Sequence, residues 1–418
     1  MCPRVVVTGA GVISPLADSP AGLHAALCAG RSGIKPIELF ATEGIGCRQA
    51  GEIRPFEPRD YLGDRNLRPI DRTSRLLLVA AQGALEASGW TAELRASREM
   101  GLALGTTFCS VRTIAEFDRR GMQLGPSYAS PLDFANSVIN AAAGQAAIWH
   151  DLRGVNSTLS AGEASGLQAI AYAVGLIRSG RAEALLAGGA EELCFESFLG
   201  YHRAGRLCGS ADSADIGAEL AVPFDRRRNG FALAEGAAML ALEEAGSAAG
   251  RGAAVLAEVL GHGAAFAASR EEGEAAAAVA RAVRLALDDA GVGPEGIDAL
   301  SASANGSVAV DRWEALGVAR AMGPRAADLP VTAIKSMLGE AMGASGALQT
   351  VAILGTLADG ALPGILGLES ADEDFPLPGA GAEARRVEVR RALLTAVSAD
   401  GHCCALILGA PGTAGGPA

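Results

Sequence analysis

The sequence is poor in aromatic residues, lysine and histidine. Aromatic side chains make up 4% of the 418 residues, lysine occurs twice and histidine five times. No apolar run is long enough to cross a membrane, and no secretory signal is recognisable, so we expect a cytoplasmic protein with no membrane partner. The net charge of −12 provides no basic surface for a phosphate backbone, so we expect no nucleic-acid partner.

The cysteines show no pattern that indicates a metal site. None of the eight forms a CxxC pair, and none has metal-ligand spacing with a histidine. We therefore expect no metal and no other cofactor. In a reducing compartment most of these thiols should be small, buried apolar side chains.

Apolar residues and glycine, by contrast, are abundant. Half of the residues are apolar and 55 are glycine, which is typical of a closely packed α/β protein. Residues 4–13, RVVVTGAGVI, form a continuous β-branched run and predict a strand buried on both faces. Residues 71–89 have the spacing of a long amphipathic helix that stops at a glycine, and residues 100–105 predict a second buried strand.

The second half of the chain repeats this order. Residues 253–260 resemble the first strand, residues 297–303 resemble the second, and residues 345–369 repeat residues 165–191 as a helix followed by an apolar strand. The repetition predicts two βαβαβ halves in a five-layer α/β/α/β/α arrangement. We place the halves at residues 1–250 and 251–409, and expect residues 410–418 to be a disordered tail.

Residues 156–170, NSTLSAGEASGLQAI, mark the point around which the chain is organised. Small and hydroxylated residues lead directly into an amphipathic helix, so that a strand-to-helix corner presents one side chain, Glu163. A helix N-terminus offers unpaired N–H groups, which favour a nucleophile or an oxyanion at such a corner. Glu163 could equally be an acidic cap on the first turn of the helix.

The corner resembles the nucleophile motif of the β-ketoacyl carrier-protein synthases, which are condensing enzymes of the thiolase fold. Their motif is Thr-Ala-Cys-Ala-Ser-Gly, and residues 161–166 read Ala-Gly-Glu-Ala-Ser-Gly, with Glu163 in place of the acyl-accepting cysteine. Further similarities lie in the opening strand and turn, in residues 140–145 (NAAAGQ), and in residues 223–225 (PFD). The resemblance covers nearly the whole chain and implies the thiolase fold.

The same resemblance implies that two catalytic histidines are replaced. The first belongs to a Val-x-Ala-His-Gly-Thr segment, which corresponds here to residues 301–307 with Asn305 at the histidine position. The second belongs to Lys-Ser-x-x-Gly-His, which corresponds to residues 335–340, where Lys335 is retained and the histidine is Glu340. The nucleophile and both histidines of condensation are therefore absent.

Two interpretations of the remaining charged residues stay open. Glu163 and Glu340 could form a carboxylate pair with proton chemistry, since two close carboxylates raise one pKa. Alternatively, Glu340 pairs with Lys335 and fills the old pocket with a satisfied polar network. A triad of Ser398, Asp400 and His402 is disfavoured because triad partners usually converge from separate segments.

A condensing-enzyme fold without its catalytic trio resembles the chain-length factors of type II polyketide synthases. These non-catalytic proteins form heterodimers with an active ketosynthase and shape its acyl tunnel, so the implied partners are that ketosynthase, the growing acyl chain and an acyl carrier protein. The candidate tunnel wall, whose members could also be ordinary core residues, comprises Phe108, Thr113, Ile114, Phe117, Val138 and Ile139. The densest candidate for carrier-protein docking comprises Arg226, Arg227 and Arg228, which could also be a solvated loop.

Two other functions remain possible. One is a malonyl-carrier-protein decarboxylase acting as an initiation factor, which the missing histidines disfavour. The other is a stand-alone lipid-binding or scaffold homodimer. The sequence does not distinguish an aromatic polyketide from a reduced polyene as the product.

Overall fold

The computed structural model describes residues 3–210, 219–371 and 375–413. Of the expected tail, residues 410–413 form a turn after the last strand, and residues 414–418 lie outside the described residues. Within the described ranges, no helix combines the length and apolar character that a membrane span requires.

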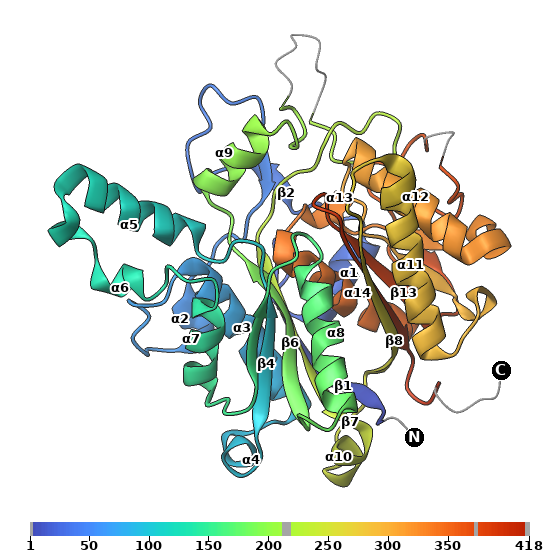
Figure 1. Cartoon of the computed structure of the whole chain (residues 1–418), viewed down its shortest axis with the longest axis horizontal. Helices are drawn as coiled ribbons and strands as arrows, with labels where there is room; N and C mark the ends of the chain where they lie inside the picture. Colours follow the sequence, from blue (N-terminus) through green and yellow to red (C-terminus); the bar gives the residue numbers. More distant parts are fainter. Residues whose placement is uncertain (1–2, 211–218, 372–374, 414–418) are drawn as a thin grey trace.

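A ten-stranded mixed sheet runs through the molecule, in the order β10-β9-β13-β14-β8-β1-β7-β6-β4-β5 (Figure 1). The first half uses β1 (Val5–Ile13), β4 (Met100–Gly105), β5 (Asn156–Leu159), β6 (Ala184–Glu191) and β7 (Gly236–Glu244). The second half uses β8 (Ala257–Phe266), β9 (Ala299–Ser301), β10 (Val331–Thr332), β13 (Arg391–Val397) and β14 (His402–Gly409). Three antiparallel residue pairs between β1 and β8 join the halves.

The two halves have the same topology in mirrored order. In the first, β4 pairs in parallel with β5 and β6, and β7 pairs antiparallel with β6 and β1. In the second, β9 pairs in parallel with β10 and β13, and β14 pairs antiparallel with β13 and β8. The predicted duplication is confirmed.

One strand of the repeat was assigned to the wrong segment. The residues that follow the second-half helix form only the two-residue β11 (Ala361–Leu362), which pairs with β12 (Arg385–Arg386) outside the large sheet. The counterpart of β6 is β13, which begins at Arg391. An insertion therefore separates helix from strand in the second half, and apolar composition alone did not reveal it.

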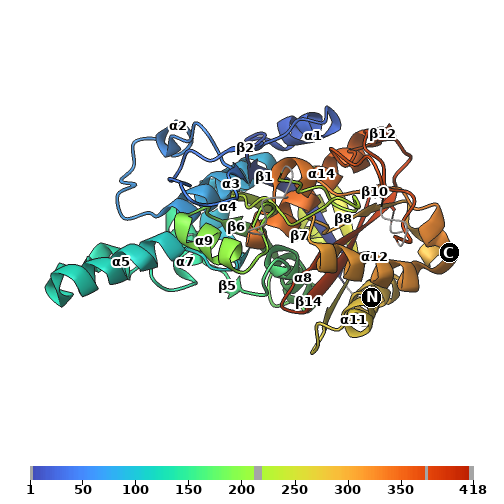
Figure 2. The same ribbon diagram turned by 90° about the horizontal axis from the view of Figure 1, so that it is seen from above.

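Helices lie outside each half of the sheet and between the two halves, which gives the five-layer α/β/α/β/α arrangement. α3 (Arg72–Ser88) packs against β1 and β7 on the outer side of the first half, and α11 (Glu272–Ala290) packs with α12 (Val308–Met322) outside the second. Between the halves lie α8 (Ser165–Arg178) and α14 (Ser345–Asp359), which contact each other and strands of both halves (Figures 1 and 2). The first ten residues of α14 are all buried, as a helix in a central layer requires.

The duplication extends to the hydrogen bonds before the two central helices. Ser165 and Ser345, at the start of α8 and α14, accept hydrogen bonds from the amides of Ala161 and Ala341 at 2.9 and 3.0 Å. Residue 162 (φ +55°) and residue 342 (φ +48°) are both left-handed, and they are glycine and methionine respectively. The candidate site therefore lies where two copies of one strand-to-helix corner face each other.

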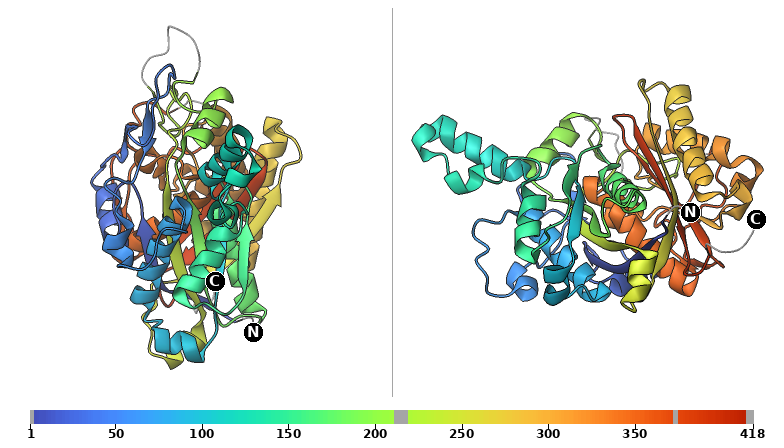
Figure 3. Two further views of the ribbon diagram at one scale, coloured as in Figure 1. Left: turned by 90° about the vertical axis from the view of Figure 1, so that its left-hand side faces the viewer. Right: turned by 60° about the horizontal axis from the view of Figure 1, so that its bottom comes forward.

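An arm projects from the first half. It consists of α5 (Val111–Leu124), a 3-10 turn at Pro126–Tyr128 and α6 (Pro131–Phe134), and none of the residues in these three elements is buried. Figure 3 shows the arm standing away from the body of the molecule.

Candidate functional site

Glu163 lies at the corner between β5 and α8 and is 3% exposed. Its Oε1 accepts a hydrogen bond from Arg206 Nη2 at 2.6 Å, and its Oε2 accepts one from the hydroxyl of Ser398. Both carboxylate oxygens are therefore held by donors from distant segments. The Glu163 side chain is fixed in an ion pair.

The turn between β13 and β14 closes over this corner. The Glu163 amide donates to Ser398 Oγ at 3.3 Å, so backbone and side chain of Glu163 use the same hydroxyl. A Cβ added to Gly162 would lie 2.1 Å from that oxygen, and glycine also permits the left-handed conformation found there. The corner and the turn are thus in direct contact, with no room for a side chain between them.

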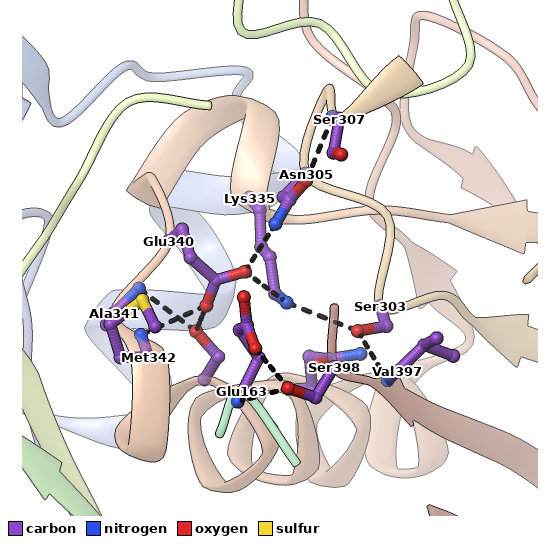
Figure 4. Close-up of polar contacts among 12 residues, drawn as sticks. Glu163, Ser303, Asn305, Ser307, Lys335, Glu340, Ala341, Met342, Val397 and Ser398 are labelled. Carbon is purple, nitrogen blue, oxygen red and sulfur yellow. Dashed lines mark hydrogen bonds and ion pairs between the residues drawn. The ribbon is translucent and has the colours of Figure 1, made fainter. Parts of the chain in front are cut away.

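Glu340 is fully buried and has partners for both oxygens. Its Oε2 accepts from Lys335 Nζ and from Asn305 Nδ2, each at 2.8 Å. Its Oε1 accepts from Ser345 Oγ at 2.6 Å and from the amide of Met342 at 3.0 Å. The Glu340–Lys335 ion pair considered in the sequence analysis is therefore present, within a polar network that has four donors (Figure 4).

The network continues from Lys335 toward the second half of the sheet. Lys335 Nζ donates to Ser303 Oγ at 3.3 Å, and that hydroxyl oxygen accepts from the Val397 amide at 3.0 Å (Figure 4). Nearby, Glu314 accepts from the Ser303 amide at 2.7 Å, and burial raises the pKa of its carboxyl to about 7. Hydrogen-bonded protein groups therefore surround Lys335 on this side.

Glu163 and Glu340 belong to one region but have separate partners. Both carboxylates raise the pKa of the Tyr201 phenol, after burial, which is the largest cause. Glu163 is nevertheless bound to Arg206 and Ser398, and Glu340 to Lys335 and Asn305, with no hydrogen bond between the two carboxylates. This arrangement favours a satisfied network over a carboxylate pair that shares a proton.

Backbone donors beside the corner are also occupied. Loop 106–110 follows β4, and the amides of Thr107, Phe108 and Cys109 donate to the carboxylate of Glu191 at 2.6 to 3.0 Å. Burial nevertheless raises the pKa of Glu191 to about 7. These N–H groups, which could otherwise stabilise a developing oxyanion, bind an internal carboxylate instead.

The loop residues Ser398, Asp400 and His402 do not form a triad. His402 Nδ1 lies 3.0 Å from Asp400 Oδ1, but the Ser398 hydroxyl donates to Glu163. The His402 ring packs edge-on against Phe266 at 4.9 Å and is partly exposed. Among the described residues, no cluster of three or more His, Cys, Asp or Glu side chains could hold a metal ion.

Comparison with known proteins identifies the family to which this chain belongs. The β-ketoacyl synthase N-terminal domain family matches residues 3–248, and the β-ketoacyl synthase C-terminal domain family matches residues 256–369. The chain belongs to the β-ketoacyl synthase family. Its fold is the thiolase-like fold expected from the sequence.

Relatives of this chain include both polyketide and 3-oxoacyl synthases. It is 34% identical over 415 residues to the tetracenomycin polyketide synthase ketoacyl synthase beta subunit of Streptomyces glaucescens, covering 97% of this chain and 98% of that protein. It is 32% identical over 389 residues to 3-oxoacyl-(acyl-carrier-protein) synthase 2 of Coxiella burnetii, covering 92% and 93%. The solved ishigamide ketosynthase/chain length factor has a TM-score of 0.90 and 33% identity, covering 99% of this chain and 100% of that one.

The six candidate wall residues lie in three different environments of the structure. Phe108 lines an apolar cavity of about 360 Å³ together with Val111, Gly200 and Tyr201. Thr113 instead lines a crevice with Arg72, Glu116 and other charged side chains, which argues against its place on an apolar wall.

The other wall candidates belong to the arm and its return to the body. Ile114 and Phe117 are half-buried on α5, and the Phe117 ring lies 5.9 Å from that of Phe134. Val138 and Ile139, beyond α6, are 52% and 43% exposed. None of the four is an ordinary core residue of this chain alone.

The arginine cluster is only partly a surface. Arg226 and Arg227 are exposed, although Arg227 is tied to Asp225 and to Glu369 by ion pairs. Arg228 is 5% exposed and donates to the carbonyls of Asp225 and Val308, so the docking prediction is wrong for Arg228. Consecutive arginines suggested a solvated loop, but the side chain of the third is buried and donates to backbone carbonyls. For Arg226 and Arg227, docking remains a prediction.

Sequence reasoning missed two partners that define the site. Arg206 belongs to no recognisable motif, so no local signal linked it to Glu163. Ser345 could have been found, because it repeats the position of Ser165 in the duplicated corner.

Proposed function

We propose that this chain is a non-catalytic chain-length factor, which forms a heterodimer with an active ketosynthase and shapes the tunnel for its growing acyl chain. The observation that carries the proposal is the occupied nucleophile corner. Glu163 stands there with both carboxylate oxygens bound to Arg206 and Ser398. Such a carboxylate cannot accept and release an acyl chain as a cysteine thiolate does.

The groups around the corner support the same conclusion. Condensation needs acid, base or oxyanion-stabilising side chains near the nucleophile. The corresponding positions hold Asn305 and Glu340, and the Asn305 amide donates to the Glu340 carboxylate within the Lys335 network. The pocket is consistent with a stable subunit that leaves chemistry to its partner.

The arm supports the heterodimer. Its side chains include large apolar groups that water would otherwise surround, and patches of this kind mark protein interfaces. Those more than 40% exposed are Met122, Leu124, Tyr128, Leu132, Phe134, Val138 and Ile139. Because the S. glaucescens relative is a ketoacyl synthase beta subunit, we infer that an active ketosynthase covers this surface, and that an acyl carrier protein delivers the chain to that ketosynthase.

The tunnel wall would then be built at this interface. Phe108 contributes from its apolar cavity, while Ile114, Phe117, Val138 and Ile139 contribute from the arm. Side chains here would limit how many two-carbon units fit before chain growth stops. Phe117→Ala and Phe108→Ala should therefore lengthen the products of the reconstituted pair, and unchanged products would remove these residues from the wall.

Native mass spectrometry tests the proposal directly. The chain is measured alone and after co-expression with the ketosynthase of the same pathway. A 1:1 heterodimer that displaces any homodimer supports the proposal. A stable homodimer indifferent to the ketosynthase contradicts it and favours a scaffold, while turnover of malonyl carrier protein by the lone chain would establish a decarboxylase.

A further inference from the structure

The apolar cavity beside Phe108 lies between two helices that contact each other, α5 and α9 (Phe195–Arg203) (Figure 1). Arg206, which follows α9, lines the cavity and also pairs with Glu163, so the cavity adjoins the corner between β5 and α8. Most of its wall is carbon, contributed by Phe108, Val111, Gly200, Tyr201 and Ala204.

The acidic and hydroxyl side chains that α9 adds to the lining already have partners in the chain. Glu196 accepts a hydrogen bond from Arg119 at 3.2 Å. Ser197 donates to the Cys194 carbonyl at 3.1 Å. Neither polar side chain therefore needs a ligand in the cavity to satisfy it.

Arg206 is also occupied, and it packs against aromatic rings. Its Nη2 donates to Glu163 at 2.6 Å. Its guanidinium lies 5.2 Å from the ring centre of Tyr201 and 5.4 Å from that of Phe231, and the Tyr201 ring in turn lies 6.0 Å from the ring of Phe108. Because Tyr201 and Arg206 are neighbours, any further hydrogen bond that they donate serves one point of the cavity and not its whole length.

Gly200 keeps the cavity open from within α9. Its backbone is helical, and a Cβ built on it would meet no atom within 4 Å beyond its chain neighbours and the backbone of the helix. Glycine inside a helix is less favourable than alanine, and here neither packing nor conformation requires it. Gly166 in α8 differs, because a Cβ there would lie 2.5 Å from the carbonyl oxygen of Gly343. At Gly200 the missing side chain instead leaves open space.

This lining suits a hydrocarbon chain better than a chain of ketones. A poly-β-keto chain carries an oxygen on every second carbon, and each oxygen loses its water when it is buried. Donors would then be needed along the whole chain, whereas the wall offers carbon and occupied polar groups except beside Tyr201 and Arg206. A reduced chain, by contrast, gains free energy from burial against the same surface.

We propose that the cavity receives a reduced acyl chain, saturated or polyene, and that the open space at Gly200 determines how far this chain extends. The inference rests on the proposed chain-length role, because the chain is the one that grows on the partner ketosynthase. It adds the class of that chain, hydrocarbon and not poly-β-keto, and it adds Gly200 as a residue that determines specificity. The volume of about 360 Å³ is within the range for small-molecule sites.

Binding by the lone chain tests the cavity without a partner. Isothermal titration calorimetry compares two N-acetylcysteamine thioesters of equal chain length, a decanoyl ester and an ester with two ketone groups at its far end. The decanoyl ester should bind about tenfold more tightly or better. Equal or weaker binding of the decanoyl ester would overturn the assigned class of chain, and no binding of either ester would overturn the cavity as an acyl site.

Glycine variants locate that binding. Gly200→Leu fills the cavity from α9 without a clash and should weaken binding of the decanoyl ester about tenfold. Gly250→Leu is the matched control, because Gly250 ends α10 (Ala245–Gly250), lies outside the cavity lining and has equally open space for a Cβ. Gly200→Ala gives the same test with a smaller effect if Gly200→Leu does not fold. Unchanged affinity in both Gly200 variants, or equal losses at Gly200 and Gly250, would contradict the assigned position.

The reconstituted pair separates this inference from the chain-length role. With the ketosynthase, Gly200→Leu should shorten the products, Gly200→Ala should shorten them less, and Gly250→Leu should leave them unchanged. Products of normal length from an intact Gly200→Leu heterodimer would contradict the role of Gly200 and leave the chain-length role in place. Failure of the unaltered chain to form a heterodimer would contradict that role, while calorimetry on the lone chain would still decide whether the cavity takes a hydrocarbon chain.

Discussion

The region around Glu163 and Glu340 differs from the arm in whether the chain itself supplies partners for its side chains. Around Glu163 and Glu340, buried charges find partners inside the chain, and the turn at Ser398 closes over the corner. Along α5 and α6, by contrast, no residue is buried and several large apolar side chains face water. A polar centre with internal partners beside an arm with exposed apolar side chains is consistent with the proposed non-catalytic subunit of a heterodimer.

The largest expected effect comes from removing the buried ion pair of Lys335 with Glu340. Lys335→Met would leave the buried Glu340 carboxylate without its counter-ion and should destabilise the fold by about 3–5 kcal/mol. Urea unfolding of the lone chain measures this change. The control is Lys35→Met, which alters the other lysine of the chain, an exposed one, and should change stability by less than about 0.5 kcal/mol.

A double variant separates charge from packing. Lys335→Met combined with Glu340→Gln removes both charges and should recover much of the lost stability. Wild-type stability in the single Lys335→Met variant would show that Glu340 does not need its ion pair, which would undermine the interpretation of a charged plug.

The arm should show the opposite behaviour, with loss of association and little loss of stability. Val138→Asp places a charge among exposed apolar side chains and should weaken the proposed heterodimer by about 2 kcal/mol, a factor of about 30 in Kd. Val308→Asp is the matched control, because Val308 is 56% exposed against 52% for Val138 but lies on α12 in the other half. Analytical ultracentrifugation with the ketosynthase gives both values, and equal effects would contradict the arm as interface.

The base of the arm is also expected to respond to pH. Glu192 accepts a hydrogen bond from the amide of Arg112, at the start of α5, and burial raises the pKa of its carboxyl to about 8. A carboxyl with a raised folded pKa binds more protons when folded, so stability should fall as pH rises from about 4.5 toward 8, by up to about 1.4 kcal/mol per pH unit. Urea unfolding at several pH values measures the slope.

Two variants separate Glu192 from other groups. Glu192→Gln should reduce that slope, whereas Glu99→Gln, at an exposed position before β4, should leave it unchanged. Glu191, with a pKa raised to about 7, contributes in the same direction, so the slope should shrink and not vanish. An identical slope in Glu192→Gln would show that Glu192 is ionised in the folded protein.

The sequence could predict features that depend on neighbouring residues, but not contacts between distant segments. The duplicated halves, the corner at Glu163 and the Glu340–Lys335 pair were predictable because periodicity and short motifs are local properties. Arg206 was not, because it reaches Glu163 from a segment 43 residues away and carries no motif of its own. Arg228 looked solvated because nothing local revealed that the carbonyls of Asp225 and Val308 accept its hydrogen bonds.

The exposure of the arm could not be predicted from the sequence for a related reason. Its apolar spacing resembles that of a helix packed on a core, and in this chain no core covers it. An interface residue and a core residue have the same local pattern, and only the tertiary structure separates them. The local pattern also did not show that Thr113, one turn from Phe117 on the same helix, lies beside charged groups.

The smallest expected effect comes from the residue at the corner itself. Glu163→Gln removes the charge that pairs with Arg206, whose side chain is 27% exposed, and keeps an oxygen that can accept from Ser398. The stability loss should be about 1 kcal/mol, since a partly exposed ion pair contributes little. If Glu163 only fills the corner, product length in the reconstituted pair should also stay unchanged. A large loss of product with an intact heterodimer would instead assign a chemical role to Glu163. It would contradict the interpretation that the centre only provides a stable, charge-balanced core.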